Sequence, residues 1–224
     1  MANYHISVNQ FAAFAKATPK GKKRIISNQI KVDLVLVSWY RTAKAFMRKY
    51  FQNFNSTAPL KECIEKLNAK EVKTKHDAID KRVSIEAIEK LLHIVFPRPL
   101  YNSHYEFLKA EKTPVNINDV DISITPEAIF KTKINGIVVY GGIKLHFGKS
   151  RPFDYTQCRY ISILLQDYIK NNILKPGEKV EPKLCLCVDI FSERVVSSEG
   201  KSSTEVAKIK ELCNEIKEIW RSAV

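Results

Sequence analysis

Residues 127–147, EAIFKTKINGIVVYGGIKLHF, decide which fold the sequence predicts. Two runs of strand-forming residues flank the dipeptide Asn135-Gly136. Both central positions of a type I′ turn need positive φ, which Asn and Gly tolerate, so this dipeptide is a strong signal for a two-residue hairpin turn. The stretch therefore predicts a β-hairpin in which Ile134 pairs with Ile137.

The predicted register places Lys144 directly opposite Glu127. Opposed residues in an antiparallel pair point to the same face of the sheet, with Cβ atoms roughly 4.5 to 5.5 Å apart. Gly142 and His146 share that face with Lys144, because side chains alternate along a strand. The other face takes the apolar residues of the second strand: Ile143, Leu145 and Phe147. A β-bulge at Gly141-Gly142 would shift the register by one residue.

Further regular elements surround the hairpin. The residue pattern predicts a half-buried strand over 120–124, a helix over 154–172, a nearly all-apolar strand over 183–191 and a helix over 202–220. Both helices begin with a capping box, formed by Asp154 with Gln157 and by Ser202 with Glu205. The order predicts an α/β (α+β) fold in which helices flank a mixed sheet.

The first hundred residues have a helical pattern instead. Helices are predicted from Ser7 to Pro19 and over 33–53, 57–68 and 76–96. In the helix over 33–53, apolar residues recur three and four apart on one face: Leu36, Trp39, Tyr40, Ala43, Phe46, Met47 and Tyr50. The proline-containing segment 96–105 is the best boundary. We therefore expect a basic helical region over 1–100 and an α/β core over 101–224.

The positive charge is concentrated in the first half of the chain. Residues 1–100 carry 19 Lys and Arg against 8 Asp and Glu, whereas residues 101–224 carry 18 against 16. Residues 16–49 hold 10 basic residues and a single acid, Asp33, interleaved with aromatic residues. Such a block binds polyanions by neutralising phosphates and releasing counterions, which favours nucleic acid as the partner. A basic, soluble helix face is the alternative interpretation.

Ten basic residues are predicted to contact nucleic acid, with DNA favoured over RNA. Eight lie in the N-terminal block and two follow the hairpin: Lys20, Lys22, Lys23, Arg24, Arg41, Lys44, Arg48, Lys49, Lys149 and Arg151. The last two lie in a loop next to the candidate site strand, where they would suit a phosphate group. They are equally compatible with ordinary loop charges.

The sequence is not expected to be that of a zinc-binding, membrane-spanning or secreted protein. Cys185 and Cys187 form a C-x-C pair, but no second Cys or His pair lies at zinc-ligand spacing. The five cysteines are therefore predicted to be buried thiols in a reducing cytoplasm. No apolar run approaches the length of a membrane span, and the N-terminus lacks a secretory pattern.

The order of elements and the lysine on the second hairpin strand resemble the PD-(D/E)XK, or restriction-endonuclease-like, nuclease superfamily, in particular its RecB-like members. In that family an acid on the first hairpin strand and a D/E-X-K tripeptide on the second hold divalent metal ions, and the lysine orients or activates the attacking water. The resemblance covers roughly residues 101–200 and implies phosphodiester hydrolysis that depends on Mg²⁺ or Mn²⁺.

The resemblance assigns roles to individual residues. Glu127 corresponds to the first acid, with Asp121 as the fallback, and Lys144 corresponds to the tripeptide lysine. Gly142 occupies the position of the tripeptide acid. Because one carboxylate holds Mg²⁺ poorly, a second acid must come from elsewhere, and the candidates are Glu106, Asp119, Asp121 and Asp154.

Accessory roles fall on residues around the hairpin and the following helix. His146 is a candidate accessory residue, with a strand-end polar residue as the alternative. Gln157 and Tyr160 resemble a Gln and a Tyr of RecB-like members, although Gln157 is also explained as a capping partner. Asp189, inside an apolar strand, must find a partner if it is buried, and an ion pair or a cap to a neighbouring loop is the favoured interpretation.

Two functions of different classes are compatible with these residues. The leading hypothesis is a nucleic-acid-binding protein with a nuclease-like core and metal-dependent hydrolysis. The alternative is a catalytically degenerate core that binds nucleic acid or a partner protein without cleaving, which Gly142 favours; Glu127 and Lys144 are then an exposed cross-strand ion pair. A structural interaction protein is the third hypothesis, and a homodimer is compatible with each.

Overall fold

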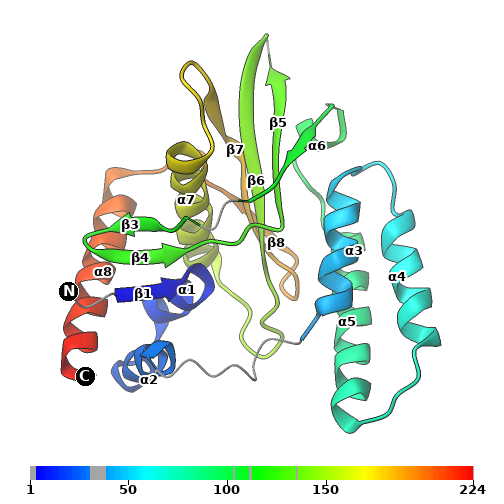
Figure 1. The fold of residues 1–224 in the computed structure, drawn as a ribbon, viewed down its shortest axis with the longest axis horizontal. Helices are drawn as coiled ribbons and strands as arrows, with labels where there is room; N and C mark the ends of the chain where they lie inside the picture. The colour runs from blue at the N-terminus through cyan, green and yellow to red at the C-terminus, as the bar shows by residue number, and fades with distance from the viewer. Residues whose placement is uncertain (1–3, 31–38, 103, 111–112, 135, 224) are drawn as a thin grey trace.

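A computed structural model describes residues 4–30, 39–102, 104–110, 113–134 and 136–223 (Figure 1). The described residues form a mixed α/β structure with two sheets, which confirms the predicted fold class. The strands are β1 (Tyr4–Ser7), β2 (Glu106–Leu108), β3 (Val115–Ile117), β4 (Val120–Ser123), β5 (Ala128–Ile134), β6 (Ile137–His146), β7 (Lys179–Asp189) and β8 (Arg194–Ser197). The helices are α1 (Val8–Lys16), α2 (Pro19–Ile30), α3 (Arg41–Phe51), α4 (Ala58–Ala69), α5 (Lys75–His93), α6 (Pro99–Asn102), α7 (Tyr155–Asn172) and α8 (Ser203–Ala223).

The larger sheet is built on the predicted hairpin. Its strand order is β2-β5-β6-β7-β8, with β6 and β7 parallel and the other neighbours antiparallel. The β5–β6 register runs without a shift from the pair Ile134 and Ile137 to the pair Ala128 and Ile143, as predicted. Gly136 has φ +79°, which the turn requires, whereas Asn135 lies outside the described residues.

A register irregularity does occur near the glycine pair, but on the other side of β6 from the hairpin. Between β6 and β7 the register shifts, because Tyr140 pairs with Val180 but Gly142 pairs with Cys185. The extra residues are therefore on β7, and the β5–β6 hairpin keeps its register. Glu127 and Lys144 consequently remain opposed.

The predicted strand over 120–124 belongs to a second sheet. β4 pairs in parallel with β1 and antiparallel with β3, giving the order β1-β4-β3. The N-terminal strand β1, which the sequence did not predict, thus pairs with a strand more than a hundred residues away. Local sequence patterns carry no signal for such a pairing.

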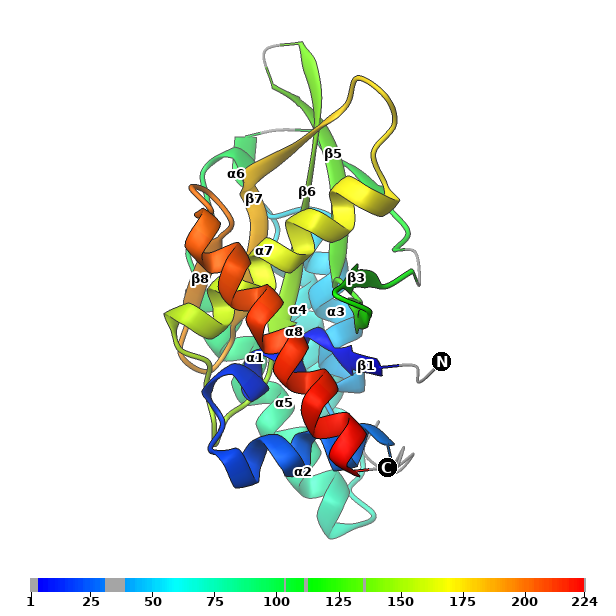
Figure 2. The same cartoon turned by 90° about the vertical axis from the view of Figure 1, so that its left-hand side faces the viewer.

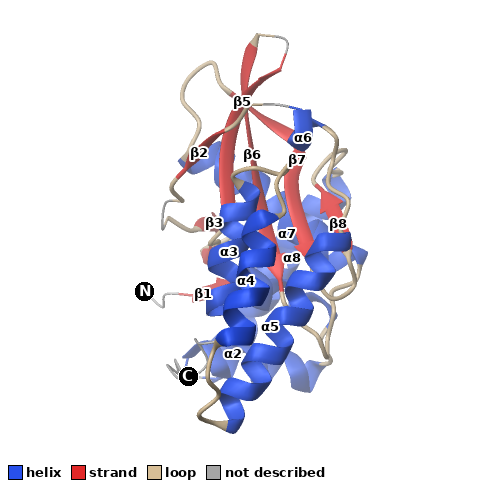
Figure 3. Cartoon of the chain, turned by 90° about the vertical axis from the view of Figure 1, so that its right-hand side faces the viewer, coloured by secondary structure: helices blue, strands red, loops and turns tan. Residues whose placement is uncertain are grey.

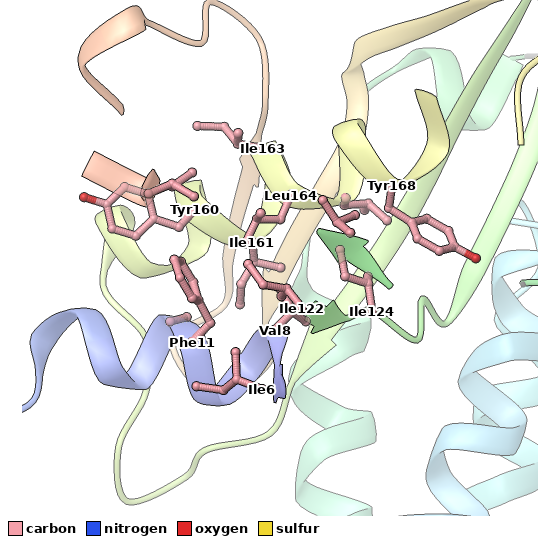
Figure 4. Close-up of a cluster of buried hydrophobic side chains, with 14 of the residues drawn as sticks. Ile6, Val8, Phe11, Ile122, Ile124, Tyr160, Ile161, Ile163, Leu164 and Tyr168 are labelled. Atoms are coloured by element: carbon pink, nitrogen blue, oxygen red, sulfur yellow. The ribbon is translucent and has the colours of Figure 1, made fainter. Parts of the chain in front are cut away.

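Helices cover both faces of the larger sheet (Figures 1 and 2). On one face lie α7, α1, α2 and α8, with the smaller sheet, around a core that includes Ile122, Ile161 and Leu164 (Figure 4). On the other face α3, α4 and α5 pack together against the sheet (Figure 3). Residues 4–30 thus share a core with α7 and α8. The division at residue 100 stays a prediction.

The predicted helix over 33–53 is shorter than expected. Residues 31–38, including Leu36, lie outside the described residues, and α3 begins only at Arg41. Tyr40 has φ +61°, which is incompatible with a continuing helix, and its backbone N–H donates to Asp80 over 2.9 Å. A contact with another helix therefore fixes the start of α3.

The predicted capping boxes and the predicted buried cysteines agree with the structure. Asp154 and Gln157 form a reciprocal capping box at the start of α7, and Ser202 and Glu205 exchange equivalent hydrogen bonds before α8. All five cysteines are buried free thiols, and burial raises the pKa of Cys213 to about 12. Among the described residues, no helix is long and apolar enough to cross a membrane.

Candidate nucleic-acid interface

Lys144 and Glu127 form a buried ion pair. Lys144 Nζ lies 3.2 Å from both carboxylate oxygens of Glu127 and donates a third hydrogen bond to Thr125 O over 2.8 Å. Glu127 Oε2 also accepts from the backbone N–H of Leu145 over 2.7 Å. The side chains are only 10% and 4% exposed, so the interpretation as an exposed surface pair is wrong.

The Glu127–Lys144 pair is buried by an element outside the hairpin. The face of β6 that carries Gly142 and Lys144 is the face on which α7 packs. A helix lying on that face removes the pair from water, and a buried charge is tolerated only with a partner and hydrogen bonds. Each oxygen of Glu127 and the ammonium of Lys144 has such partners, which explains how the pair is accommodated.

The space for a tripeptide acid at Gly142 is occupied. A Cβ added there would lie 3.1 Å from Ala128 O, 3.2 Å from Ile169 Cδ1 and 3.4 Å from Leu165 Cδ1. The first contact is with backbone, and the other two are side chains of α7. Glycine at this position lets α7 approach the sheet closely, and a side chain here would require Ala128 O and the side chains of Ile169 and Leu165 to shift.

The other predicted metal-binding acids are held elsewhere. Asp121, on β4 in the smaller sheet, accepts from Asn116 Nδ2 over 2.7 Å. The remaining candidates pair with lysines of their own surroundings: Glu106 with Lys131, Asp119 with Lys217 and Asp154 with Lys16. Within the described part of the chain, no three His, Cys, Asp or Glu side chains are grouped to hold a metal ion. Glu127, whose oxygens are engaged by Lys144 and by the N–H of Leu145, thus belongs to no such group in the described part of the chain.

A second acid and base pair lies two residues further along β6. His146 Nδ1 lies 2.7 Å from Asp189 Oδ2, and the same oxygen accepts from the backbone N–H of Phe153 over 2.7 Å. Asp189 Oδ1 accepts from both the N–H and the hydroxyl of Ser192, each over 2.8 Å. Asp189 is fully buried and caps the loops at Phe153 and Ser192, which is one of the two interpretations that the sequence favoured, and it also contacts the ring of His146.

The charge state of Asp189 follows from these contacts. Burial raises its pKa, but the hydrogen bonds from His146, Phe153 and Ser192 outweigh burial and leave the pKa below the usual value. The carboxylate thus stays ionised and orients the imidazole through Nδ1. The ring of His146 stacks on Phe153, with centroids 3.4 Å apart and planes within 5°.

His146 also lines a large open cavity, here called the basic groove, of about 1100 Å³. One wall comes from α1 and α2, and the other from residues 146–153, Gln157 and Lys44 of α3. Its lining residues are Asn9, Gln10, Ala13, Lys16, Ala17, Thr18, Gly21, Arg24, Ile25, Asn28, Lys44, His146, Phe147, Gly148, Arg151, Pro152, Phe153 and Gln157. Four of them are cationic, and none of these described lining residues is acidic.

The basic groove brings together only part of the predicted cationic set. Arg24, Lys44 and Arg151 line it, whereas Lys22 pairs with Glu215 over 2.7 Å. The other predicted cations are not lining residues: Lys20, Lys23, Arg41 and Arg48 are exposed, Lys49 lies over Phe46, and Lys149 pairs with Glu86. The accessory candidates His146 and Gln157 both line the groove.

Lys44 is the least exposed of the groove cations. Its ammonium lies over the ring of Phe147, 4.9 Å from the centroid, and burial lowers its pKa from the usual lysine value. Glu127 opposes that shift, whereas Lys144 and Arg48 add to it. Lys44 is therefore within electrostatic range of the buried Glu127–Lys144 pair.

Sequence reasoning missed Lys16 and the amide residues of the groove. Lys16 belongs to the basic block, and nothing in the local pattern of α1 indicates that it lines the same cavity as Arg151. Asn9, Gln10 and Asn28 are ordinary helix residues in isolation. Gln157 is a capping residue, as predicted, and its Nε2 also donates to Ala12 O over 3.0 Å, tying α7 to α1.

Comparison of the sequence with protein-family models and with curated proteins finds no match. The functional interpretation therefore depends on the groove, the two buried pairs and the restriction-endonuclease-like resemblance of the sequence.

Proposed function

We propose that this chain binds nucleic acid in the basic groove and that its restriction-endonuclease-like sheet does not cut. The observation that carries the proposal is the charge of the groove. Arg24, Lys44 and Arg151 converge on it from separate segments, together with Lys16, which also pairs with Asp154 over 3.2 Å, and the described lining residues include no acid. A concave surface of one sign attracts a polyanion and neutralises its phosphates.

We infer that the protein does not cleave nucleic acid from Glu127 and Gly142, the positions at which restriction-endonuclease-like nucleases have their metal-binding acids. Glu127 is engaged by Lys144 and by the N–H of Leu145, and Gly142 is covered by α7. Hydrolysis assisted by a metal ion needs carboxylates that are free to bind it and an open position for water. These contacts support the degenerate alternative over the metal-dependent nuclease.

Salt-dependent binding to a DNA duplex and to a single strand tests the binding step. Wild-type affinity should fall steeply with salt, and Arg24→Gln with Arg151→Gln should reduce the slope of log affinity against log salt by about one per removed contact. Lys149→Gln is the matched control, because Lys149 is close in sequence to Arg151 but pairs with Glu86. Affinity that does not depend on salt would leave a structural interaction protein as the function.

A cleavage assay tests the second half of the proposal. Plasmid, single-stranded DNA and RNA should remain intact in Mg²⁺, Mn²⁺ and EDTA, and binding should survive EDTA. Metal-dependent cleavage that is lost in both Lys144→Ala and Glu127→Ala would overturn the proposal and restore the nuclease hypothesis. The preference for DNA over RNA stays a prediction.

A further inference from the structure

His146 has one ring nitrogen with a fixed partner and one without. Asp189 is ionised and a carboxylate only accepts hydrogen bonds, so Nδ1 of His146, which lies 2.7 Å from Asp189 Oδ2, carries a proton. Asp189 is fixed in turn by the N–H groups of Phe153 and Ser192, and the ring of His146 stacks on Phe153. The imidazole is therefore held in one orientation, and Nε2 is the nitrogen that can gain or lose a proton.

The edge of the ring that carries Nε2 is left uncovered by Gly148. A Cβ at that position would lie 2.3 Å from Cε1 and 2.8 Å from Nε2 of His146, so any other residue would block this edge. No described residue forms a hydrogen bond with Nε2. His146 lines the basic groove, and 12% of its side chain is exposed. Nε2 is therefore the ring nitrogen that a ligand in the groove can reach.

Charged groups of several elements share the groove with His146 or contact its neighbours. Most are cations: Lys16 on α1, Arg24 on α2, Lys44 on α3, Arg151 in the loop and Arg194 on β8, which donates to Phe153 O. The nearby Lys144 and Lys149 are paired with Glu127 and Glu86. Cations disfavour the imidazolium form of His146, whereas Asp189 on β7 favours it. A ligand anion that neutralises the cations therefore shifts the balance toward protonation.

A phosphodiester matches the protonated ring and not the neutral one. Phosphate oxygens accept hydrogen bonds, and Nε2 of a neutral ring whose Nδ1 carries the proton also only accepts. Protonated Nε2 donates, and a hydrogen bond between an imidazolium and a phosphate is charge-assisted at both ends. The added positive charge is balanced by the ionised carboxylate of Asp189, which contacts the other nitrogen of the ring.

From this geometry we infer that His146 is a phosphate-binding residue of the basic groove that acts only in its protonated form, so that the nucleic acid binds together with a proton. The inference rests on the proposed function and adds a proton to the binding step. Asp189 is a positioning residue, because it holds the ring and balances its charge. Since the phosphate stabilises the protonated form, the contribution of His146 to binding is present in acid and is lost as pH rises through the range of about 5 to 8 in which imidazoles change charge.

Anisotropy titrations with a labelled DNA duplex and a labelled single strand, at a constant salt concentration of about 0.15 M, provide the first test. Wild-type affinity should fall by about 3- to 10-fold from about pH 5.5 to about pH 8. His146→Gln should remove most of this fall, because a carboxamide does not titrate, and should bind much as the wild type does at the upper end of the range. His93→Gln is the matched control and should keep the wild-type profile, because His93 is exposed on α5 and does not line the groove.

Titration calorimetry counts the proton directly and separates ligand binding from folding. The binding enthalpy, measured at about pH 7 in buffers of different ionisation enthalpy, gives the number of protons taken up with the DNA. The wild type and His93→Gln should take up a fraction of one proton, and His146→Gln should take up none. A merely structural role of His146 would change the affinity of the variant but not the proton count.

The outcomes distinguish the inference from the proposed function. If binding falls steeply with salt but has the same affinity at every pH, the inference fails while the proposed function stands. The same conclusion follows if His146→Gln takes up as many protons as the wild type. If neither form of DNA binds at any pH in the range, both fail.

Discussion

Lys144 and His146 lie two residues apart on one face of β6, and each contacts a buried carboxylate, yet the two pairs serve different parts of the molecule. Their exposures are alike, at 10% for the side chain of Lys144 and 12% for that of His146. The contacts of Glu127 stay within the hairpin, at Lys144 and Leu145. Those of Asp189 reach two loops, at Phe153 and Ser192.

The difference shows that burial alone does not separate a structural pair from a site. Lys144 is absent from the lining of the basic groove, whereas His146 is part of it. The two pairs differ in which segments the other hydrogen bonds of their carboxylates reach. Glu127 bonds to Lys144 and Leu145 of the same hairpin. Asp189 bonds to the N–H of Phe153, in the segment 146–153 that lines the basic groove.

Gly142→Asp extends the comparison to the third residue on this face and should have the largest effect. Overpacking against Ala128 O and α7, together with a buried charge, should lower the free energy of unfolding by roughly 3 to 6 kcal/mol. Urea unfolding measures the change, with Ser123→Asp at an exposed position of β4 as a control for the added carboxylate. Wild-type stability with new Mg²⁺ binding would show that the tripeptide acid is tolerated.

Lys144→Met tests whether the first pair is purely structural. Glu127 would be left as a buried charge without its partner, which should cost roughly 3 to 5 kcal/mol of stability. Combining it with Glu127→Gln removes both charges and keeps an acceptor for the N–H of Leu145, so most of the loss should be recovered. A double variant that is as unstable as the single one would contradict this account.

Asp189→Asn tests the second pair and should have a smaller effect on stability. A carboxamide has one acceptor oxygen where Asp189 uses two, so the donors from either Phe153 and His146 or Ser192 lose their partner. The expected cost is roughly 2 to 3 kcal/mol. Unlike Lys144→Met, it should also weaken binding in the basic groove, measured by anisotropy, because the loop wall loses its anchor.

The contribution of Asp189 should depend on pH. Because its pKa in the folded protein lies below the usual value, its stabilising effect is present above the unfolded pKa of about 3.9 and is lost as pH falls below that value. The stability difference between wild type and Asp189→Asn should therefore narrow as pH falls below about 3.9, which urea unfolding at a series of acidic pH values measures. A difference that persists unchanged at low pH would mean that ionisation of Asp189 contributes nothing.

Local patterns predicted much of this arrangement. Asn135-Gly136 predicted the hairpin and its register, and the capping residues Asp154 and Ser202 predicted where α7 and α8 begin. These features depend on φ preferences and on neighbours a few residues away. The start of α3 was predicted wrongly because it depends on Tyr40 and on Asp80, forty residues along the chain.

The sequence by itself determined that Lys144 stands opposite Glu127, because turn geometry and strand periodicity fix the opposed residues without reference to the rest of the chain. Only the tertiary structure decided whether this pair is exposed or buried and whether it lies in the basic groove. Packing of α7 over Gly142 buried the pair, and folding of α1, α2 and α3 around residues 146–153 assembled the basic groove. Burial and concavity arise from contacts between distant segments, which no local pattern encodes.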